Sequence, residues 1–122
     1  MTRRKLVSVI DDDESVRESL PDLLREFGYD VEAFASAEGF LESASLGLAN
    51  CLILDVVMPG MSGPQLQQEL IRRRHEVPII FITAHADKPR PHLPLTSTVS
   101  CLTKPFSEAD LLVAIHAALK DQ

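Results

Sequence analysis

The chain has 122 residues, of which 45% are hydrophobic and 25% are charged, a composition typical of one soluble globular domain. Its 12 basic and 18 acidic side chains give a net charge of −6, which argues against direct binding to nucleic acid. No apolar run approaches the roughly 20 residues that span a bilayer, and the aspartates at positions 11–13 end the first apolar stretch too early for a signal peptide. We therefore expect a cytoplasmic protein that is not bound to a membrane.

The first half of the chain alternates short apolar runs with segments of helical periodicity. This pattern predicts a strand, a helix, a second strand and a short second helix, over residues 5–10, 14–27, 29–34 and 36–44. Apolar side chains, Phe27 among them, lie on one face of the first helix, and Gly28 ends it. Asp13 and Ser36 are expected to cap the two helices.

The second half of the chain continues the alternation. Its apolar runs predict three more strands, over residues 51–54, 78–82 and 98–103. The helix after the third strand is expected to have Pro64 at its first position. The last helix begins at Ser107, with Asp110 as its capping-box partner. Cys51 and Cys101 lie in apolar runs without metal-ligand spacing, so we expect both to be small buried hydrophobic residues.

Repeated alternation of strand and helix indicates a parallel sheet with helices on both of its faces. The predicted fold class is therefore a doubly wound α/β domain over residues 1–122. One segment interrupts the alternation, because a fourth helix is expected between residues 86 and 97, where Pro89, Pro91 and Pro94 occur. Three prolines cannot all lie inside one helix, so we expect this helix to be shortened, displaced or lost.

Polar side chains occur where the predicted strands end. Asp11 and Asp12 follow the first strand, Asp55 follows the third, and Thr83 and Lys104 follow the fourth and fifth. The carboxyl ends of parallel strands share one edge of the sheet, which is where open α/β folds bind their ligands. Each residue alone has an ordinary structural role, such as a turn former, a helix cap or a surface lysine. Their coincidence at four strand ends favours a functional site.

The chemistry of these side chains indicates a phosphoryl site. Two carboxylates 4 Å apart repel by roughly 4 kcal/mol at an effective dielectric of about 20, so three of them require compensating positive charge or the uptake of a proton. Lys104 supplies one charge, and an oxygen-only ligand set favours Mg²⁺. A carboxylate that attacks phosphorus needs this arrangement, and a hydroxyl such as that of Thr83 can donate to a phosphoryl oxygen.

The strand ends carry four motifs, which are Val-Ile-Asp-Asp-Asp at 9–13, Leu-Asp-Val-Val-Met-Pro-Gly-Met-Ser-Gly at 54–63, Phe-Ile-Thr-Ala-His at 81–85 and Lys-Pro-Phe at 104–106. Together these motifs resemble the receiver domains of bacterial two-component response regulators. Segment 36–41 and the residues around Asp55 are most similar to the nitrogen-fixation (FixJ-type) regulators. The resemblance covers essentially the whole chain and implies a CheY-like fold, with a five-stranded sheet in the order 2-1-3-4-5 flanked by five helices.

The resemblance also implies a function for the strand-end residues. Asp55 would accept a phosphoryl group from a phosphohistidine of a sensor histidine kinase. Asp11 and Asp12 would bind Mg²⁺ together with Asp55 and the backbone carbonyl of Val57. The domain would then change conformation and regulate an output such as transcription, with a second copy of the chain or a downstream effector as a further partner.

Two further features of the family bear on the switch. The resemblance implies that Thr83 and Lys104 contact the acyl phosphate, that Thr83 moves toward it, and that the Lys104–Pro105 peptide bond is cis. Receivers usually carry an aromatic residue three positions before this lysine, where the chain has Cys101. Because of that difference and the proline-rich segment 86–97, the resemblance does not determine the chemistry of the face by which the family usually dimerises and signals.

Other functions are weighed against the phosphorylated switch. The first alternative is a receiver-fold module that binds partners independently of phosphorylation. The changes at Cys101 and in segment 86–97 favour it, and the intact pocket residues count against it. An aspartyl phosphatase would need a second aspartate two residues after the nucleophile, where Val57 stands. We therefore expect a regulatory domain and not an enzyme, with at most self-phosphorylation from small donors and slow autodephosphorylation. The residues leave open a single-domain regulator or a longer chain with a DNA-binding domain.

Overall fold

The computed structural model describes residues 4–83 and 99–120 of the chain. They form one five-stranded sheet in the order β2-β1-β3-β4-β5, and every neighbouring pair is parallel. The elements are β1 (Leu6–Ile10), α1 (Glu14–Glu26), β2 (Asp30–Phe34), α2 (Ala37–Leu41), the 3₁₀ helix η1 (Ala44–Gly47), β3 (Cys51–Asp55), α3 (Gly63–Arg72), β4 (Ile79–Thr83), β5 (Val99–Thr103) and α4 (Glu108–Leu119). The predicted doubly wound α/β fold and its strand order are confirmed.

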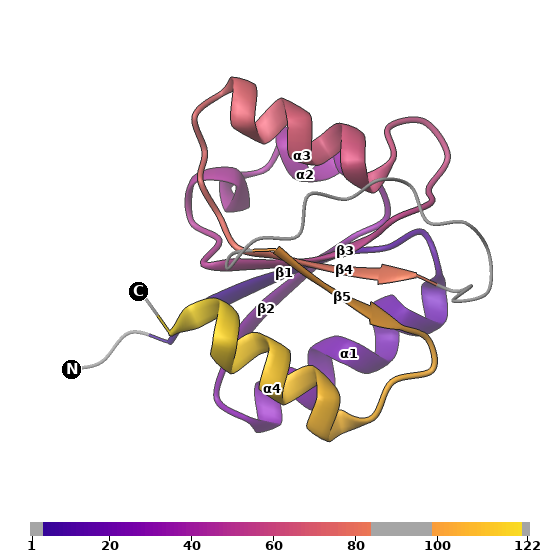
Figure 1. Cartoon of the computed structure of the whole chain (residues 1–122), viewed down its shortest axis with the longest axis vertical. Helices are drawn as coiled ribbons and strands as arrows, with labels where there is room; N and C mark the ends of the chain where they lie inside the picture. Colours follow the sequence, from indigo (N-terminus) through magenta and orange to yellow (C-terminus); the bar gives the residue numbers. More distant parts are fainter. Residues whose placement is uncertain (1–3, 84–98, 121–122) are drawn as a thin grey trace.

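Helices cover both faces of the sheet, α2 and α3 on one and α1 and α4 on the other (Figure 1). Each helix layer packs on its own cluster of buried apolar side chains. Val7 and Val9 of β1 belong to the cluster under α1 and α4, whereas Ile10 belongs to the cluster under α2 and α3. β3 lies at the centre of the sheet and is buried along its whole length, as its uninterrupted apolar run predicts.

Side-chain caps fix where several helices begin. Asp13 accepts a hydrogen bond from the Ser15 N–H at the start of α1, and Ser36 accepts one from the Gly39 N–H at the start of α2. Ser107 likewise accepts from the Asp110 N–H. Among the described residues, the side chain of Asp110 does not complete that box, because an aspartate is one methylene shorter than the usual Glu or Gln partner.

The prediction for the start of α3 was wrong by one residue. Gly63 takes the first helical position and Pro64 the second, because Ser62 is the N-cap. A complete capping box forms here: the Ser62 hydroxyl accepts from the Gln65 N–H, and the Gln65 side chain accepts from the Ser62 N–H. The Ser-x-x-Gln pattern is visible in the sequence.

Three other details correct the predictions. The second helix ends at Leu41 and is followed by the separate turn η1, so it does not continue to residue 44. Phe27 is 47% exposed, because α1 ends before it and Gly28, at φ +93°, turns the chain away. Cys101 is only half-buried, because β5 is an edge strand with a neighbour on one side, whereas Cys51 is fully buried in the central strand.

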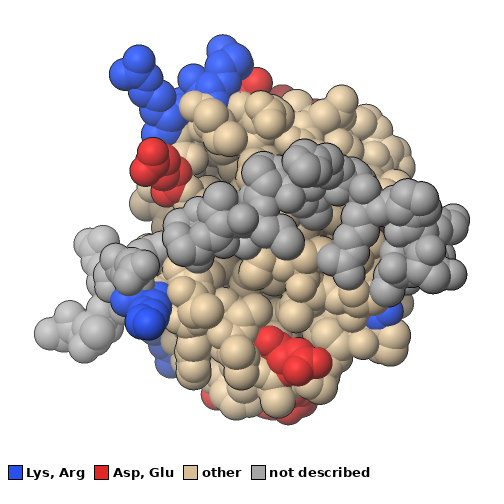
Figure 2. Space-filling model, viewed as in Figure 1, with Lys and Arg blue, Asp and Glu red and all other residues tan. Residues whose placement is uncertain are grey.

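Segment 86–97 lies outside the described residues, so the expectation of an altered fourth helix stays a prediction. The label α4 in Figure 1 therefore belongs to the helix that follows β5 and not to the helix expected in that segment. No helix in the described ranges is long and apolar enough to cross a membrane. On the face drawn in Figure 2, the basic side chains of the described residues lie in small separate groups near the rim.

Candidate functional site

The carboxyl ends of four strands bring the predicted polar residues to one edge of the sheet. Asp11 and Asp12 follow β1, Asp55 ends β3, Thr83 ends β4 and Lys104 follows β5. One carboxylate oxygen from each of the three aspartates lies within 4.8 Å of the others. Lys104 places its ammonium nitrogen 3.0 Å from Oδ2 of Asp11. The structure therefore forms the acidic cluster that the sequence predicts, with one lysine against it.

Thr83 enters the site through the backbone ladder between β4 and β5. Its carbonyl accepts a hydrogen bond of 2.8 Å from the Lys104 N–H, just beyond the point where Thr83 pairs with Thr103. The Thr83 side chain is half-buried. The peptide bond between Lys104 and Pro105 is cis, as the family resemblance implies.

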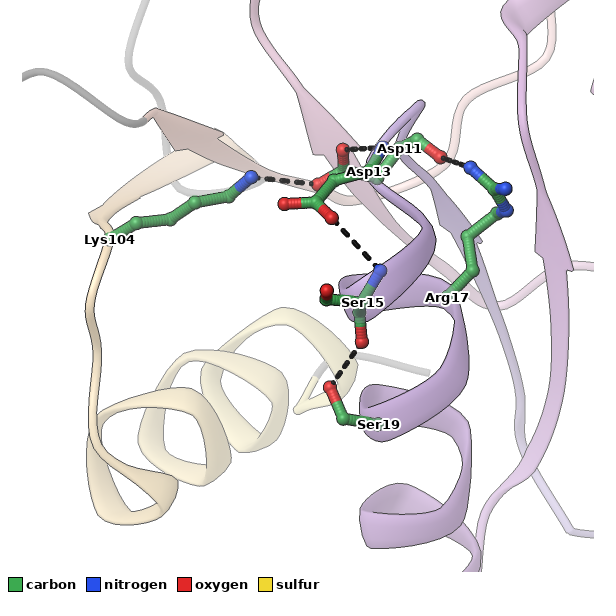
Figure 3. A network of polar contacts seen from close by, with 6 residues as sticks. All are labelled: Asp11, Asp13, Ser15, Arg17, Ser19 and Lys104. Atoms are coloured by element: carbon green, nitrogen blue, oxygen red, sulfur yellow. Dashed lines mark hydrogen bonds and ion pairs between the residues drawn. The ribbon is translucent and has the colours of Figure 1, made fainter.

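Asp11 is the most constrained residue of the cluster and is 0% exposed. Its N–H donates to the Phe34 carbonyl at 3.1 Å, which extends the β1–β2 ladder by one residue. Its carboxylate accepts from the Asp13 N–H at 2.9 Å and from Lys104 at 3.0 Å. Its carbonyl accepts from the Arg17 guanidinium at 3.0 Å (Figure 3). Backbone and side chain of Asp11 are thus both fixed.

Asp55 is 7% exposed and has a strongly perturbed acidity. Burial, and then the negative charge of Asp11, raise the pKa of the Asp55 carboxyl from 3.8 to about 7. The charge of Lys104 and a hydrogen bond from the Val57 backbone act in the opposite direction. The pocket therefore favours either a proton on Asp55 or additional positive charge beside it.

Two glycines allow the loop between β3 and α3 to pack against the site. A Cβ on Gly63 would clash with the Asp55 carbonyl oxygen, so no larger residue fits there without movement. Gly60 has φ +75°, and a Cβ there would lie 2.7 Å from a carboxylate oxygen of Glu38 in α2. The Glu38 carboxylate also accepts a long hydrogen bond from the Met61 N–H.

The oxygen donors fit a small hard cation. Three carboxylates face one ammonium group, and Asp12 is exposed, which leaves room for water ligands on one side. Mg²⁺ takes few carboxylates together with waters and phosphoryl oxygens. Neither Arg17 nor the close contact at Gly63 could be predicted from the sequence, because both depend on how the helix and loop pack against the strand ends.

Comparison with known proteins agrees with this geometry. A sequence profile of the response regulator receiver domain matches residues 7–116. Response regulator protein TodT of Pseudomonas putida is 44% identical over 119 residues, which cover 97% of this chain and 52% of TodT. Transcriptional regulatory protein FixJ of Azorhizobium caulinodans is 39% identical over 114 residues, covering 93% of this chain and 54% of FixJ. The chain thus spans about half the length of these curated relatives.

A solved structure gives the same result in three dimensions. The structure of response regulator StyR superimposes with a TM-score of 0.87 at 44% sequence identity, over 97% of this chain and 60% of StyR. Profile, relatives and superposition all cover the strands that carry the acidic cluster. The chain therefore belongs to the response regulator receiver domains of two-component systems.

Proposed function

We propose that residues 1–122 form one phosphorylatable switch in which Asp55 accepts a phosphoryl group at a Mg²⁺ site. The observation that carries the proposal is the grouping of Asp55 with Asp11 and Asp12 within 4.8 Å, with Lys104 paired to Asp11. A cluster of three carboxylates and one lysine, in which Asp11 and Asp55 are buried, is unfavourable unless a cation or proton joins it. Such a cluster suits phosphoryl transfer, which depends mainly on positioning and on neutralising charge.

The proposed reaction is transfer from a phosphohistidine of a sensor histidine kinase. A carboxylate oxygen of Asp55 forms the new P–O bond while the P–N bond to the imidazole breaks, and the imidazole keeps the electron pair and takes up a proton. Mg²⁺ held by Asp11, Asp12, Asp55 and the Val57 carbonyl would neutralise the phosphoryl oxygens. Asp55 must be ionised to react, and positive charge beside it favours that state.

Lys104 and Thr83 are proposed to read the phosphorylated state. The Lys104 ammonium is held at the site by Asp11 and is available to a phosphoryl oxygen. Thr83 lies beside Lys104 in the ladder and carries a hydroxyl that can donate to another oxygen. Phosphorylation adds about −1.5 to −2 charges at one side chain. We propose that Thr83 and the loop over residues 56–62 move in response.

The proposed output is control of transcription through a partner or a further domain. FixJ, one of the relatives, is by name a transcriptional regulatory protein. The conformational change would alter contacts of this domain with a second copy or with an effector. We propose that the domain does not itself bind nucleic acid, in keeping with its net charge of −6.

Amide NMR with beryllofluoride, a mimic of the phosphoryl group, tests the switch. In the presence of Mg²⁺, we expect beryllofluoride to shift amides in residues 55–63, 83 and 99–104 of the wild type. Asp55→Asn keeps the size of the side chain but removes the nucleophile, so these shifts are expected to vanish. If Mg²⁺ binds and beryllofluoride changes nothing in the wild type, the phosphorylated switch is wrong and a phosphorylation-independent interaction module replaces it.

A further inference from the structure

Arg17 contacts the acidic cluster from the side opposite to Lys104. It lies in the second turn of α1, is half-buried, and donates from its guanidinium to the carbonyl of Asp11 at 3.0 Å (Figure 3). Its own N–H donates to the carbonyl of Asp13 at 3.2 Å. The Arg17 guanidinium therefore holds the carbonyl of Asp11, which precedes Asp12, whereas the carbonyl of Asp13 accepts the ordinary i→i−4 backbone bond that any non-proline residue at position 17 would donate.

Asp12 is the member of the cluster that most needs such support. The Asp11 carboxylate is already held by Lys104 and by the Asp13 N–H. By contrast, no hydrogen bond among the described residues ends on the carboxylate of Asp12, which is exposed. The position of the Asp12 side chain is therefore set by its backbone, and the Asp11 carbonyl belongs to the peptide plane that leads into Asp12.

We propose that Arg17 is a positioning residue: it fixes this peptide plane and thereby holds Asp12 in the carboxylate cluster. This role rests on the Mg²⁺ site of the proposed function. A planar guanidinium fixes the direction of a carbonyl better than a flexible ammonium does. Groups that orient metal ligands from behind commonly change metal affinity by about 10- to 100-fold when they are removed.

The charge of Arg17 gives the test a clear sign. If Arg17 acted only through its positive charge, it would repel Mg²⁺, and its removal would strengthen Mg²⁺ binding. If it acts by fixing the peptide plane, its removal weakens binding, because Asp12 then samples positions outside the cluster. Arg17→Met removes the charge and the donor but keeps an apolar stem of similar reach, so the two effects predict opposite changes in the dissociation constant.

Arg25 supplies a matched control on the same helix. Its guanidinium also donates to a backbone carbonyl at 3.0 Å, that of Val31 in β2, far from the acidic cluster. Arg25→Met therefore removes the same kind of contact without touching the turn at Asp12. Titrating each folded variant with Mg²⁺ gives dissociation constants, and amide NMR without metal follows Asp12 and Asp13 directly.

We expect Arg17→Met to raise the Mg²⁺ dissociation constant about tenfold and to shift or broaden the Asp12 and Asp13 amides even without metal. Arg25→Met is expected to leave both readouts unchanged. Arg17→Lys, which keeps the charge and one donor, is expected to fall between wild type and Arg17→Met, and it carries the test if Arg17→Met does not fold.

An unchanged or lowered dissociation constant in the Arg17 variants overturns the positioning role. Equal losses of stability in the Arg17 and Arg25 variants, with unchanged Mg²⁺ binding, would assign Arg17 to the fold alone. If the wild type itself fails to bind Mg²⁺, the proposed function fails instead. The metal-free amide signals of Asp12 and Asp13 then still decide whether Arg17 fixes the turn.

Discussion

Cys51 and Asp55 begin and end β3, and burial perturbs the acidity of both side chains. Burial raises the pKa of the Cys51 thiol from 9.0 to about 12. The thiol therefore ionises at lower pH in the unfolded chain than in the folded one. Its contribution to the free energy of unfolding is fully present below pH 9.0 and is lost as the pH rises toward about 12.

Comparing wild type with Cys51→Ala separates this effect from alkaline groups that do not interact with Cys51. Tyr29 is an exception, because its pKa is raised first by burial and then by the charge of Cys51. Wild type is expected to be more stable at pH 8, and the difference in free energy of unfolding between the two proteins should shrink between about pH 9 and pH 11. Urea denaturation at each pH measures it. A difference that stays constant with pH would show that the thiol ionises alike in the folded and unfolded states.

Ser8 presents an unfavourable buried hydroxyl in β1. It is 0% exposed, and its Oγ has no hydrogen-bond partner among the described residues. Leaving a buried polar group without a partner costs about 1–3 kcal/mol. Ser8→Ala is therefore expected to raise the free energy of unfolding by about 1 kcal/mol in urea denaturation. Ser19→Ala, at an exposed hydroxyl of α1, serves as the control, and destabilisation by Ser8→Ala would contradict the absence of a partner.

At the scale of single residues, the sequence predicts a side chain's location better than its contacts. Asp11, Asp55 and Lys104 could be placed together because each lies at or just after the carboxyl end of a strand, and parallel strands end at one edge. Arg17 could not be predicted, because its contact depends on how a long side chain reaches back over the first turn of α1. The burial of the Ser8 hydroxyl, for which the described residues offer no partner, depends on packing between neighbouring strands and likewise leaves no pattern in the sequence.

At the scale of elements, the start of α3 determines how the loop after Asp55 is built. Ser62 and Gln65 fix the first turn of the helix, and Gly63 allows that turn to pack against the Asp55 carbonyl. The Gly63 N–H donates to the Val56 carbonyl at 3.0 Å. Helix, glycine and strand end thus form one unit, so a change in the glycine is transmitted to the site.

Gly63→Ala tests this unit. The added Cβ would clash with the Asp55 carbonyl oxygen, and the backbone must move to relieve the clash. We expect a loss of about 1–3 kcal/mol in the free energy of unfolding, measured in urea, together with altered amide shifts around Asp55. Gly47→Ala is the matched control, since a Cβ there meets nothing within 4 Å. Equal stability of the two variants would contradict the close packing.

Strand and helix order was predictable because hydrophobic periodicity differs between the two kinds of element. Element ends were less predictable. The Ser62 cap follows a pattern that can be read from the sequence, whereas the break between α2 and η1 follows none that we identified. The exposure of Phe27 depends on where α1 stops, which periodicity alone leaves uncertain by a residue or two.

At the scale of the whole molecule, two separate apolar clusters hold the helix layers, and the acidic site lies at the sheet edge between them. Side chains from β1, β3 and the end of β5 meet there, so an added charge at Asp55 acts on elements of both layers. The chain covers about half of its curated relatives. In a longer regulator, the conformational change proposed above would be passed to the rest of the protein.

The most direct test of the proposed switch is intact mass spectrometry after incubation with acetyl phosphate and Mg²⁺. The Asp55 carboxylate would form a P–O bond as acetate leaves, so wild type is expected to gain the mass of one phosphoryl group. Asp55→Asn, and wild type with excess chelator, are expected to gain none. Wild type that remains unmodified, or Asp55→Asn that is modified equally, would contradict the assignment of Asp55 as the phosphoryl acceptor.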